Sequence, residues 1–451
     1  MELEEKLKNL GRFNLMRGRV VDLSNKIGQV EKHLNGTMTQ NRFGEFALVR
    51  KGFDLSKLHP IIELSSSLSI KGEFLSRICL HKNQWLGVRG LGLGASSYKP
   101  PAPSPKSQAS IPQSHFNLKD AVFIDCETTG LSGGVGTYAF LVGLGFLSGG
   151  EFWVEQYFMQ DFNQERAVLS AVEERLRGFE FLVSFNGKCY DLPLMENRFL
   201  INRLDFDSTR WQHLDLLFPC RRLWKRRIVD CSLGNLERQV LGVQREIDVP
   251  SFMIPQIYFD YLRTGEVEPL VPVFHHNVHD ILSLLKLSFL IDQALEDFTR
   301  TEIKDPKDLY SLGRIHYHLG NYQTSERCFQ HALSADLTPE GRLSISLSLA
   351  FVYKKTGYLE KAEEIWCLLT EGDSPFSLTA HEELAKYYEH KRKNYPKALS
   401  FVEKALSQMK SDFFCGGDSI RSYGPSGKSQ LDSWEYRRAR LKRKVSKPQV
   451  A

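Results

Sequence analysis

The sequence predicts two folded parts, an α/β domain with a mixed sheet flanked by helices and an all-α domain of helical repeats. Strand-like and helix-like segments alternate within residues 118–295, and pairs of helix-like segments recur regularly within residues 304–410. A chain of 451 residues is long enough for both parts, each with its own core.

Composition and charge predict a soluble cytoplasmic protein. Hydrophobic residues make up 42% and charged residues 25% of the chain, close to ordinary globular proteins. No apolar run could cross a bilayer and the charged start is no secretory signal, so we expect no membrane association. The eight cysteines form no C-x-x-C pair, which predicts reduced, buried thiols. A formal charge of +5 permits nucleic-acid binding without requiring it.

Three further segments are assigned from composition. Residues 1–94 contain short apolar pieces such as EFALVRKGF and leave their fold open. Residues 95–117 are rich in Pro, Ser and Ala, which predicts a linker. Residues 411–451 include the basic run RRARLKRK, which indicates either a charged tail or an auxiliary nucleic-acid contact.

The α/β domain begins with three strand-like segments that are separated by SGG turn signals. A helix and a further strand follow, which indicates a mixed sheet with helices beside it. Strands are predicted at 121–125, 137–147, 151–159 and 179–185, and helices at 164–179 and 275–291.

The helical repeats have a period slightly longer than 34 residues. Gly320 and Gly357 are 37 positions apart, and Ala362 and Ala398 are 36 apart. Helix pairs at this spacing resemble tetratricopeptide repeats, which present a surface to protein partners. The matching positions are Leu312, Gly313, Gly320, Tyr322, Phe329 and Ala332 in the first copy and Tyr353, Gly357 and Ala362 in the second. The third copy is degraded, and a protein partner is one expectation for this domain.

Carboxylates stand at three points of the α/β domain. Asp125 and Glu127 are two apart at the end of a strand and therefore share one face. Asp191 follows the strand at 179–185, and Asp280 lies in the last helix. Each also has a simpler interpretation. Asp125 and Glu127 could be polar residues at a strand end, Asp191 a helix N-cap, and Asp280 a solvated residue of a helix. If all four converge, they require a cation between them, and Mg²⁺ or Mn²⁺ prefers such oxygen ligands.

The helix at 275–291 adds a histidine to this set. Its residues Val278, Ile281, Leu282 and Leu285 form an apolar stripe. His276 and Asp280 are four apart on the opposite face, and His275 falls nearer the edge of the stripe. A histidine beside two metal ions could orient or deprotonate a water in phosphoryl transfer.

The motifs D-x-E-T-T-G, N-x-x-x-Y-D and H-N-x-x-D, in this order, resemble the DEDD superfamily of 3′–5′ exonucleases, which has a ribonuclease H-like fold. Longer segments, among them FNGKCYDLPLMENRF and RRLWKRRIVDCSLGNLERQVLG, resemble the bacterial YprB-like proteins, in which a catalytic-type domain precedes tetratricopeptide repeats. The resemblance covers residues 40–300 and, by architecture, the repeats. It implies two Mg²⁺ or Mn²⁺ ions held by Asp125, Glu127, Asp191 and Asp280, with Asn186 as the upstream partner of Asp191.

The histidine departs from the superfamily pattern. Members usually place Tyr four residues or His five residues before the last Asp, and this chain has His276 and His275 at those positions. The H-N-x-x-D form and the helical face favour His276 as the group that activates water.

Two segments are candidates for contact with nucleic acid. Thr128 and Thr129 follow the first carboxylate pair, where the end of a nucleic-acid strand would approach. The segment CRRLWKRR could hold phosphates and stack one base, or it could be a solvated helical face with its tryptophan in the core. Its residues are Arg221, Arg222, Trp224, Lys225, Arg226 and Arg227.

Together these features predict a two-metal 3′–5′ exonuclease that hydrolyses DNA or RNA at a single-stranded or 3′ end. A scaffold that binds nucleic acid or proteins without cutting is one alternative, and a structure-specific endonuclease is another. The complete set of four carboxylates favours hydrolysis.

Overall fold

The computed structural model describes residues 30–58, 116–130, 136–245, 248–371, 374–415 and 424–446. The predicted linker at 95–117 lies outside these ranges except for its last two residues. The chain divides into two compact units. The sheet unit includes Phe116–Leu217 and Ser232–Leu290, and the repeat unit includes Phe218–Cys231 and Ile291–Ala451.

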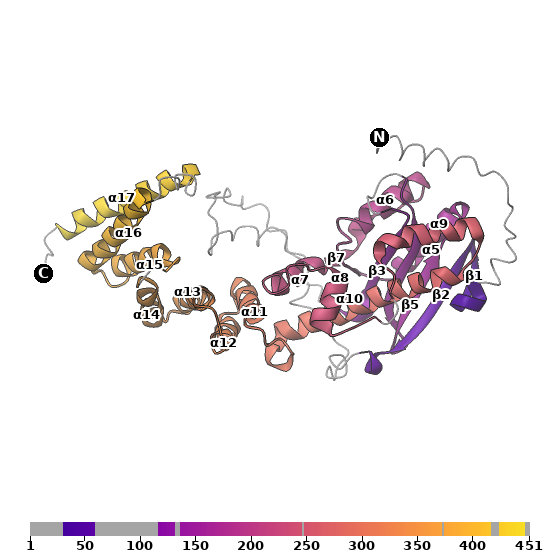
Figure 1. Cartoon of the computed structure of the whole chain (residues 1–451), viewed down its shortest axis with the longest axis horizontal. Helices are drawn as coiled ribbons and strands as arrows, with labels where there is room; N and C mark the ends of the chain where they lie inside the picture. Colours follow the sequence, from indigo (N-terminus) through magenta and orange to yellow (C-terminus); the bar gives the residue numbers. More distant parts are fainter. Residues whose placement is uncertain are drawn as a thin grey trace. The chain divides into compact units, whose positions relative to one another are not determined.

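The sheet unit is built on a seven-stranded sheet in the order β1-β2-β5-β4-β3-β6-β7 (Figure 1). Strand β3 pairs antiparallel with β4 and parallel with β6, so the predicted mixed sheet is confirmed. The strands are β1 Gly36–Asn41, β2 Gly44–Asp54, β3 Ala121–Thr128, β4 Ala139–Ser148, β5 Glu151–Phe158, β6 Phe181–Ser184 and β7 Gln212–Asp215.

Residues 36–54, for which the sequence predicted no fold, supply β1 and β2. Strand β2 pairs antiparallel with β5 from Ala47 opposite Phe158 to Asp54 opposite Glu151. The sheet therefore extends beyond the predicted range of 118–295. The segment EFALVRKGF showed an apolar piece, but its partner strand stands far along the chain, which no local pattern reveals.

Helices cover both faces of the sheet. Neighbouring residues of a strand point to opposite faces, and on β5 Glu155 accepts hydrogen bonds from Arg175 of α5, whereas Gln156 donates to the carbonyl oxygen of Phe274 in α10. Helices α5 and α10 thus lie on opposite faces. The helices of this unit are α5 Glu165–Leu176, α6 Asp191–Ile201, α8 Leu233–Leu236, α9 Ile254–Thr264 and α10 Val271–Asp297, whose last turns belong to the repeat unit.

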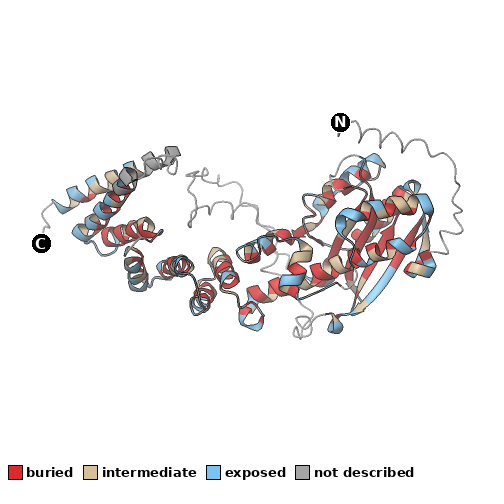
Figure 2. Cartoon of the chain, viewed as in Figure 1, coloured by how far each residue is buried: buried red, intermediate tan, exposed pale blue. Residues whose placement is uncertain are grey.

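The core of the sheet unit lies between these layers. Strand β4 is buried along eight of its ten residues because both of its faces are covered. Aromatic rings join the helices to the sheet, with Tyr258 of α9 stacked 4.0 Å from Phe140 and Phe274 of α10 5.2 Å from Phe158. Figure 2 shows the buried ribbon that runs through the strands and along α10.

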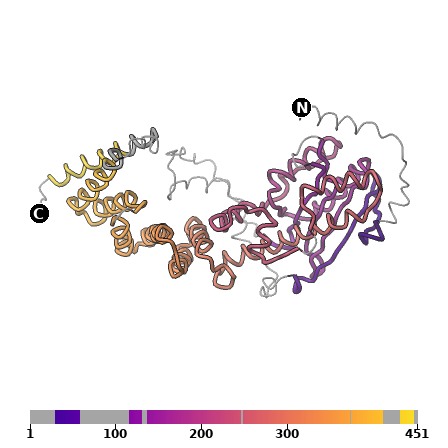
Figure 3. Tube along the Cα trace, viewed as in Figure 1, coloured from indigo at the N-terminus to yellow at the C-terminus, as the bar shows by residue number. Residues whose placement is uncertain are grey.

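The repeat unit consists of helices, and the predicted all-α domain is confirmed. Helices pair in succession, α11 with α12, α13 with α14 and α15 with α16 (Figure 3). Gly320 and Gly357 end α11 and α13 at φ +83° and +89°, a left-handed conformation that favours glycine. The helices are α7 Leu217–Trp224, α11 Pro306–Leu319, α12 Tyr322–Leu333, α13 Pro339–Thr356, α14 Leu359–Leu369, α15 Ser377–His390, α16 Tyr395–Cys415 and α17 Gly424–Val445.

The basic C-terminal segment is not a free tail between residues 424 and 445. Helix α17 buries Trp434 and Leu441. The buried carboxylate of Glu389 on α15 accepts hydrogen bonds from Arg440 (2.7 Å) and Lys444 (2.9 Å). Two cations of the RRARLKRK run therefore hold a helix in place, because a buried carboxylate requires a charged partner.

Within the described parts of the chain, no helix combines the length and apolarity needed to cross a membrane.

Candidate active site

The first two carboxylates lie near the end of β3. Asp125 and Glu127 follow four fully buried apolar residues and, two positions apart, point to one face of the sheet. The pairing of β3 with β4 shifts register directly after Glu127. Strand β6 runs parallel to β3, so the chain leaves both strands at the same edge of the sheet. Ligands of α/β sheets bind at such an edge.

The loop after β6 leads to Asp191, and Asp215 organises this loop. The buried carboxylate of Asp215 accepts hydrogen bonds from the backbone N–H groups of Asn186 (2.8 Å), Lys188 (3.1 Å) and Leu217 (3.1 Å). Asp191 then begins α6, whose N-cap residue is Tyr190. The simpler interpretation of Asp191 as an N-cap is therefore wrong. Asp215 was missed because nothing in the local pattern of β7 marks its partners.

All five residues predicted to be catalytic line one cavity of about 220 Å³. They are Asp125, Glu127, Asp191, His276 and Asp280. The wall also includes Thr128, Phe185, Asn186, Tyr190, Ser251, Ile254 and Pro255. His275, the other histidine considered from the sequence, is exposed on α10 and does not line this cavity.

Asp125 is held by a residue that the sequence analysis did not select. In the pairing register, Asp125, Gly143 and Gln156 stand side by side on β3, β4 and β5, and they point to the face that α10 covers. The amide nitrogen of Asn277 donates to the carboxylate of Asp125 (2.8 Å), and its amide oxygen accepts from Gln156 (2.9 Å). Asn277 is fully buried, and its place as the Asn of the H-N-x-x-D motif was the signal for it.

The absence of a side chain at Gly143 makes this contact possible. A Cβ atom there would overlap with the amide oxygen of Asn277 and with the side chain of Ile281. Helix α10 therefore approaches β4 closely at this point, which brings His276 and Asp280 to the end of β3.

The carboxylates repel one another inside a buried site. Burial raises the pKa of Asp125 and of Glu127 well above the usual range, and the charges of Asp280 and Asp191 raise it further. The pKa of Asp191 rises to about 7, first through burial and then through Asp215 and Asp280. Burial also raises the pKa of Asp280. Cations are needed to keep all four ionised together.

Arg245 supplies part of this positive charge. Its side chain is 7% exposed and donates to both carboxylate oxygens of Glu237 (2.6 and 2.8 Å) and to the carboxylate of Asp280. Its charge lowers the pKa of Glu127 and of Asp280 against the effect of burial. One guanidinium does not balance four carboxylates. Arg245 was missed because its partners become neighbours only in the fold.

His276 lies between two carboxylates, that of Asp248, which is not one of the four predicted metal ligands, and that of Asp280, which is one of them. Its Nδ1 is 2.7 Å from Asp248 and 3.1 Å from the guanidinium of Arg245. Its Nε2 is 3.6 Å from Asp280. A proton on Nδ1 would donate to Asp248 and leave Nε2 as the basic nitrogen on the side of Asp280.

The donor set fits hard divalent cations, since it consists of carboxylate oxygens beside one imidazole. Among the described residues, no three acidic, histidine or cysteine groups stand at the spacing of a preformed metal site. Asp280 accepts from Arg245 through Oδ1, so its Oδ2 can still serve as a metal ligand while the guanidinium stays in place. Asp125, Glu127, Asp191 and Asp280 are the residues that would hold the metal.

The residues predicted to meet a nucleic-acid end at this site separate into two groups. Thr128 lines the cavity, and its hydroxyl donates to the carbonyl oxygen of Gly130 (2.9 Å). Asn186 also lines the cavity, is exposed and has φ +63°. Thr129 does not line it, because its hydroxyl accepts from the backbone N–H of Tyr138 (2.9 Å) and closes the β3–β4 loop.

The basic segment of α7 belongs to the repeat unit. Trp224 is 1% exposed, so the prediction that it stacks on a base is wrong. Arg227 donates to the buried carboxylate of Asp308 (2.7 Å). The other four cations line a separate pocket of the repeat unit, namely Arg221, Arg222, Lys225 and Arg226.

Comparisons with known proteins agree with this architecture. Residues 122–291 match the RNase_H superfamily, whose members generally use divalent metal ions. The chain is 30% identical to the protein YprB of Bacillus subtilis (strain 168) over 333 residues, which is 73% of this chain and 76% of YprB.

Two solved structures of TPR-like repeats from Podosopora anserina also resemble the chain, one of them of a variant with a single substitution. Each is 16% identical with a TM-score of 0.24, covering 45% and 44% of this chain and 99% and 97% of theirs. Such low TM-scores support no structural conclusion. The similarity to YprB spans most of both proteins, and the chain therefore belongs to the YprB family, with an RNase H-like domain and a helical C-terminal region.

Proposed function

We propose that the protein is a metal-dependent nuclease that hydrolyses the terminal phosphodiester bond at the 3′ end of DNA or RNA by a two-metal mechanism. The observation that carries this proposal is the convergence of Asp125, Glu127, Asp191 and Asp280 on one cavity. Such a cluster raises the pKa of its own members and opposes folding when they are ionised, so a catalytic role is the better reason for it.

Bound Mg²⁺ or Mn²⁺ would activate a water and stabilise the leaving oxygen. The chain's own part is to hold the ligands and the proton acceptor. Asn277 fixes the carboxylate of Asp125, and Asp248 fixes the ring of His276. His276 would then accept the proton of the attacking water at Nε2.

The cavity lies at the edge of the sheet where β3 and β6 end. At about 220 Å³ it is smaller than the usual pocket for a drug-sized ligand, about 300 Å³ or more, so it would hold the reacting phosphate and only part of the terminal nucleotide. Thr128 and Asn186, at its wall, would contact that nucleotide. The cytoplasm is the compartment we propose, where the six cysteines that form no disulfide among the described residues would remain reduced.

The test is hydrolysis of end-labelled single- and double-stranded DNA and RNA by the full chain with Mg²⁺ or Mn²⁺. We expect mononucleotides to be released from the 3′ end and Asp125→Asn to reduce the rate at least about 100-fold. The asparagine oxygen can still accept from Asn277, so the fold should persist. Asp336→Asn, an exposed position of the repeat unit, is the matched control.

Labels at the 5′ and 3′ ends separate the alternatives. Internal fragments from the earliest times would identify an endonuclease. A protein that binds strands but cuts none, with no Mn²⁺ binding that depends on Asp125, would identify a scaffold. Undiminished hydrolysis by Asp125→Asn would contradict the proposed site.

A further inference from the structure

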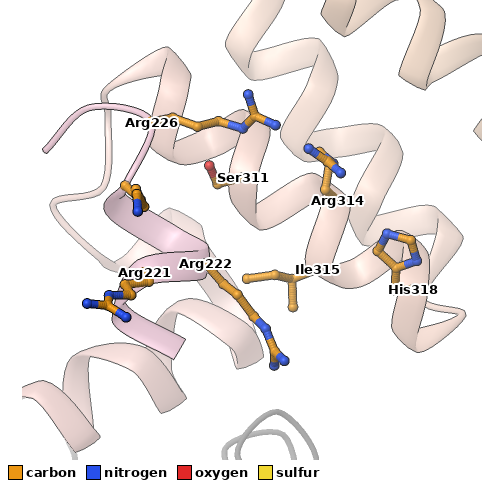
Figure 4. A pocket seen from close by; sticks show the side chains of 8 residues that line it. Arg221, Arg222, Arg226, Ser311, Arg314, Ile315 and His318 are labelled. Carbon is orange, nitrogen blue, oxygen red and sulfur yellow. The ribbon is translucent and has the colours of Figure 1, made fainter. Parts of the chain in front are cut away.

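The repeat unit contains a second pocket, of about 340 Å³, formed by α7 with the residues directly after it and by α11 (Figure 4). Helix α7 supplies the basic segment noted in the sequence, and α11 is the first helix of the repeats. The lining residues are Arg221, Arg222, Lys225, Arg226, Ser311, Arg314, Ile315 and His318. Arg314 and His318 were not selected from the sequence, because α11 approaches α7 only in the fold.

The lining is strongly cationic. Five of the eight lining residues are arginine or lysine, and none of these eight is acidic. The buried acid Asp308 stands three residues before Ser311 on α11, but it pairs with Arg227 and does not line the pocket. The pocket thus gathers positive charge and hydroxyl and imidazole groups around a single aliphatic side chain, Ile315.

Two of the arginines are positioned by one aromatic ring. The guanidinium carbons of Arg226 and Arg314 lie 4.8 and 5.8 Å from the ring centre of Tyr310. The hydroxyl of Tyr310 is 3.1 Å from those of Ser344 and Ser348 on α13, which fix the ring. In Figure 4, Arg226 from the turn after α7 and Arg314 from α11 extend toward one another.

This arrangement keeps like charges close together. Burial and the charge of Arg314 lower the pKa of Arg226. Burial, Arg314 and Arg222 likewise lower the pKa of His318. Trp224, the last residue of α7, is 1% exposed, so Arg221 and Arg222 stand on a helix with a buried end, and Lys225 and Arg226 follow it directly. An anion in the pocket would relieve their repulsion.

We propose that this pocket binds the phosphate groups of a nucleic-acid strand. Guanidinium groups match phosphate oxygens with paired hydrogen bonds. The pocket offers no exposed aromatic ring to stack on a base, so it would hold the backbone independently of sequence. The inference that the pocket binds phosphate depends only on the residues that line it. The inference that this phosphate belongs to a nucleic-acid strand rests on the proposed nuclease function.

The experiment measures strand binding separately from hydrolysis. The full chain with Asp125→Asn, in EDTA, is titrated against a short fluorescent single-stranded DNA or RNA at several salt concentrations. We expect Arg226→Gln with Arg314→Gln to weaken binding at least tenfold and to reduce the slope of log K against log salt by about 1.4, or 0.7 for each lost phosphate contact. Lys355→Gln with Lys391→Gln, both exposed cations of the repeat unit, should change neither value.

Three outcomes would overturn the proposal. They are unchanged binding by the double variant, tighter binding of a polyglutamate peptide than of the oligonucleotide at the same salt, or equal affinity for a mononucleotide and the strand. Arg314→Lys keeps the charge and should therefore retain the wild-type salt slope. That result would attribute the weaker binding of the double glutamine variant to lost charge and not to a folding defect. If wild-type protein cuts no strand but binds through this pocket, the nuclease function fails while the pocket assignment stands.

Discussion

Asn277 of α10 donates a hydrogen bond of 2.8 Å to the carboxylate of Asp125 on β3, directly over the position on β4 where Gly143 has no side chain. The same asparagine bonds to Gln156 on β5. One amide thus joins strands β3 and β5 to helix α10 at the point where the carboxylates converge.

Asn277→Ala should lower activity and Mn²⁺ affinity by about 10–100-fold, the usual effect of removing a group that orients a metal ligand. It also leaves one of the two amide N–H groups of Gln156 without an acceptor, while the other still donates to Phe274, at a stability cost of about 1–3 kcal/mol. Isothermal titration with Mn²⁺ and thermal unfolding measure the two effects. Asn163→Ala, at an exposed position, should change neither, and unchanged Mn²⁺ affinity in Asn277→Ala would contradict this role.

Gly143→Ala should destabilise the protein by about 1–3 kcal/mol, because the added methyl group overlaps with Asn277 and Ile281. Denaturant unfolding measures the loss. Gly234→Ala is the matched control, since a Cβ atom there meets no atom within 4 Å. The control should be neutral or gain about 0.4–1 kcal/mol. Equal stability of the two variants would show that α10 can move away from β4 without cost.

The metal-free protein should lose stability as pH rises through 7. The folded-state pKa of Asp191, about 7, exceeds its ordinary value of 3.8, so between these values the folded state binds more protons than the unfolded state. The contribution of Asp191 to the free energy of unfolding is fully present below about pH 4. It then falls by up to about 1.4 kcal/mol per pH unit until pH 7. Thermal unfolding in EDTA across this range measures the loss, and Asp191→Asn should reduce the slope, while Asp125 and Glu127, whose pKa values are also raised, keep the rest of it.

Bound Mn²⁺ should oppose the loss of stability at rising pH. The metal requires ionised carboxylates, so its affinity should rise with pH and its binding should release protons. Calorimetry in buffers of different ionisation enthalpy counts these protons. Metal affinity that does not change with pH would contradict a site made of the raised-pKa carboxylates.

His276→Ala should reduce the turnover rate by about 10²–10⁴-fold, the range for loss of a general base, and should change Mn²⁺ affinity little. His275→Ala is the control, because this neighbour is exposed and outside the cavity. The turnover rate at saturating Mn²⁺ should fall in the first variant and stay at the wild-type value in the second. If His275→Ala is the inactive variant, the assignment is reversed.

Arg245 should compete with the metal for Asp280. Replacing Arg245 and its partner Glu237 together by glutamine removes the competitor without leaving the buried carboxylate of Glu237 unpaired. We expect Mn²⁺ to bind at least about tenfold tighter to this double variant, a gain of about 1.4 kcal/mol. Weaker binding would mean that the guanidinium holds the ligands in place instead of competing for them.

Much of the fold was predictable because it rests on local patterns. The apolar run before Asp125 and the alternation of strands and helices indicated a mixed sheet, and the spacing of Gly320 and Gly357 indicated helix pairs. The two N-terminal strands were not predictable, because β2 finds its partner β5 only through long-range pairing. The buried position of Trp224 was one of two alternatives that charge and spacing left open.

The sequence by itself determined which groups this protein could use, namely four carboxylates and a histidine in a recognisable order, and a basic segment at α7. Only the tertiary structure decided how these groups are held. Asn277, Arg245 and Asp215 act through partners that are distant in sequence, as do Arg314 and His318 in the second pocket. The residue at each position defines its side-chain chemistry, whereas hydrogen-bond partners and electrostatic repulsion depend on distances that only the packed fold sets.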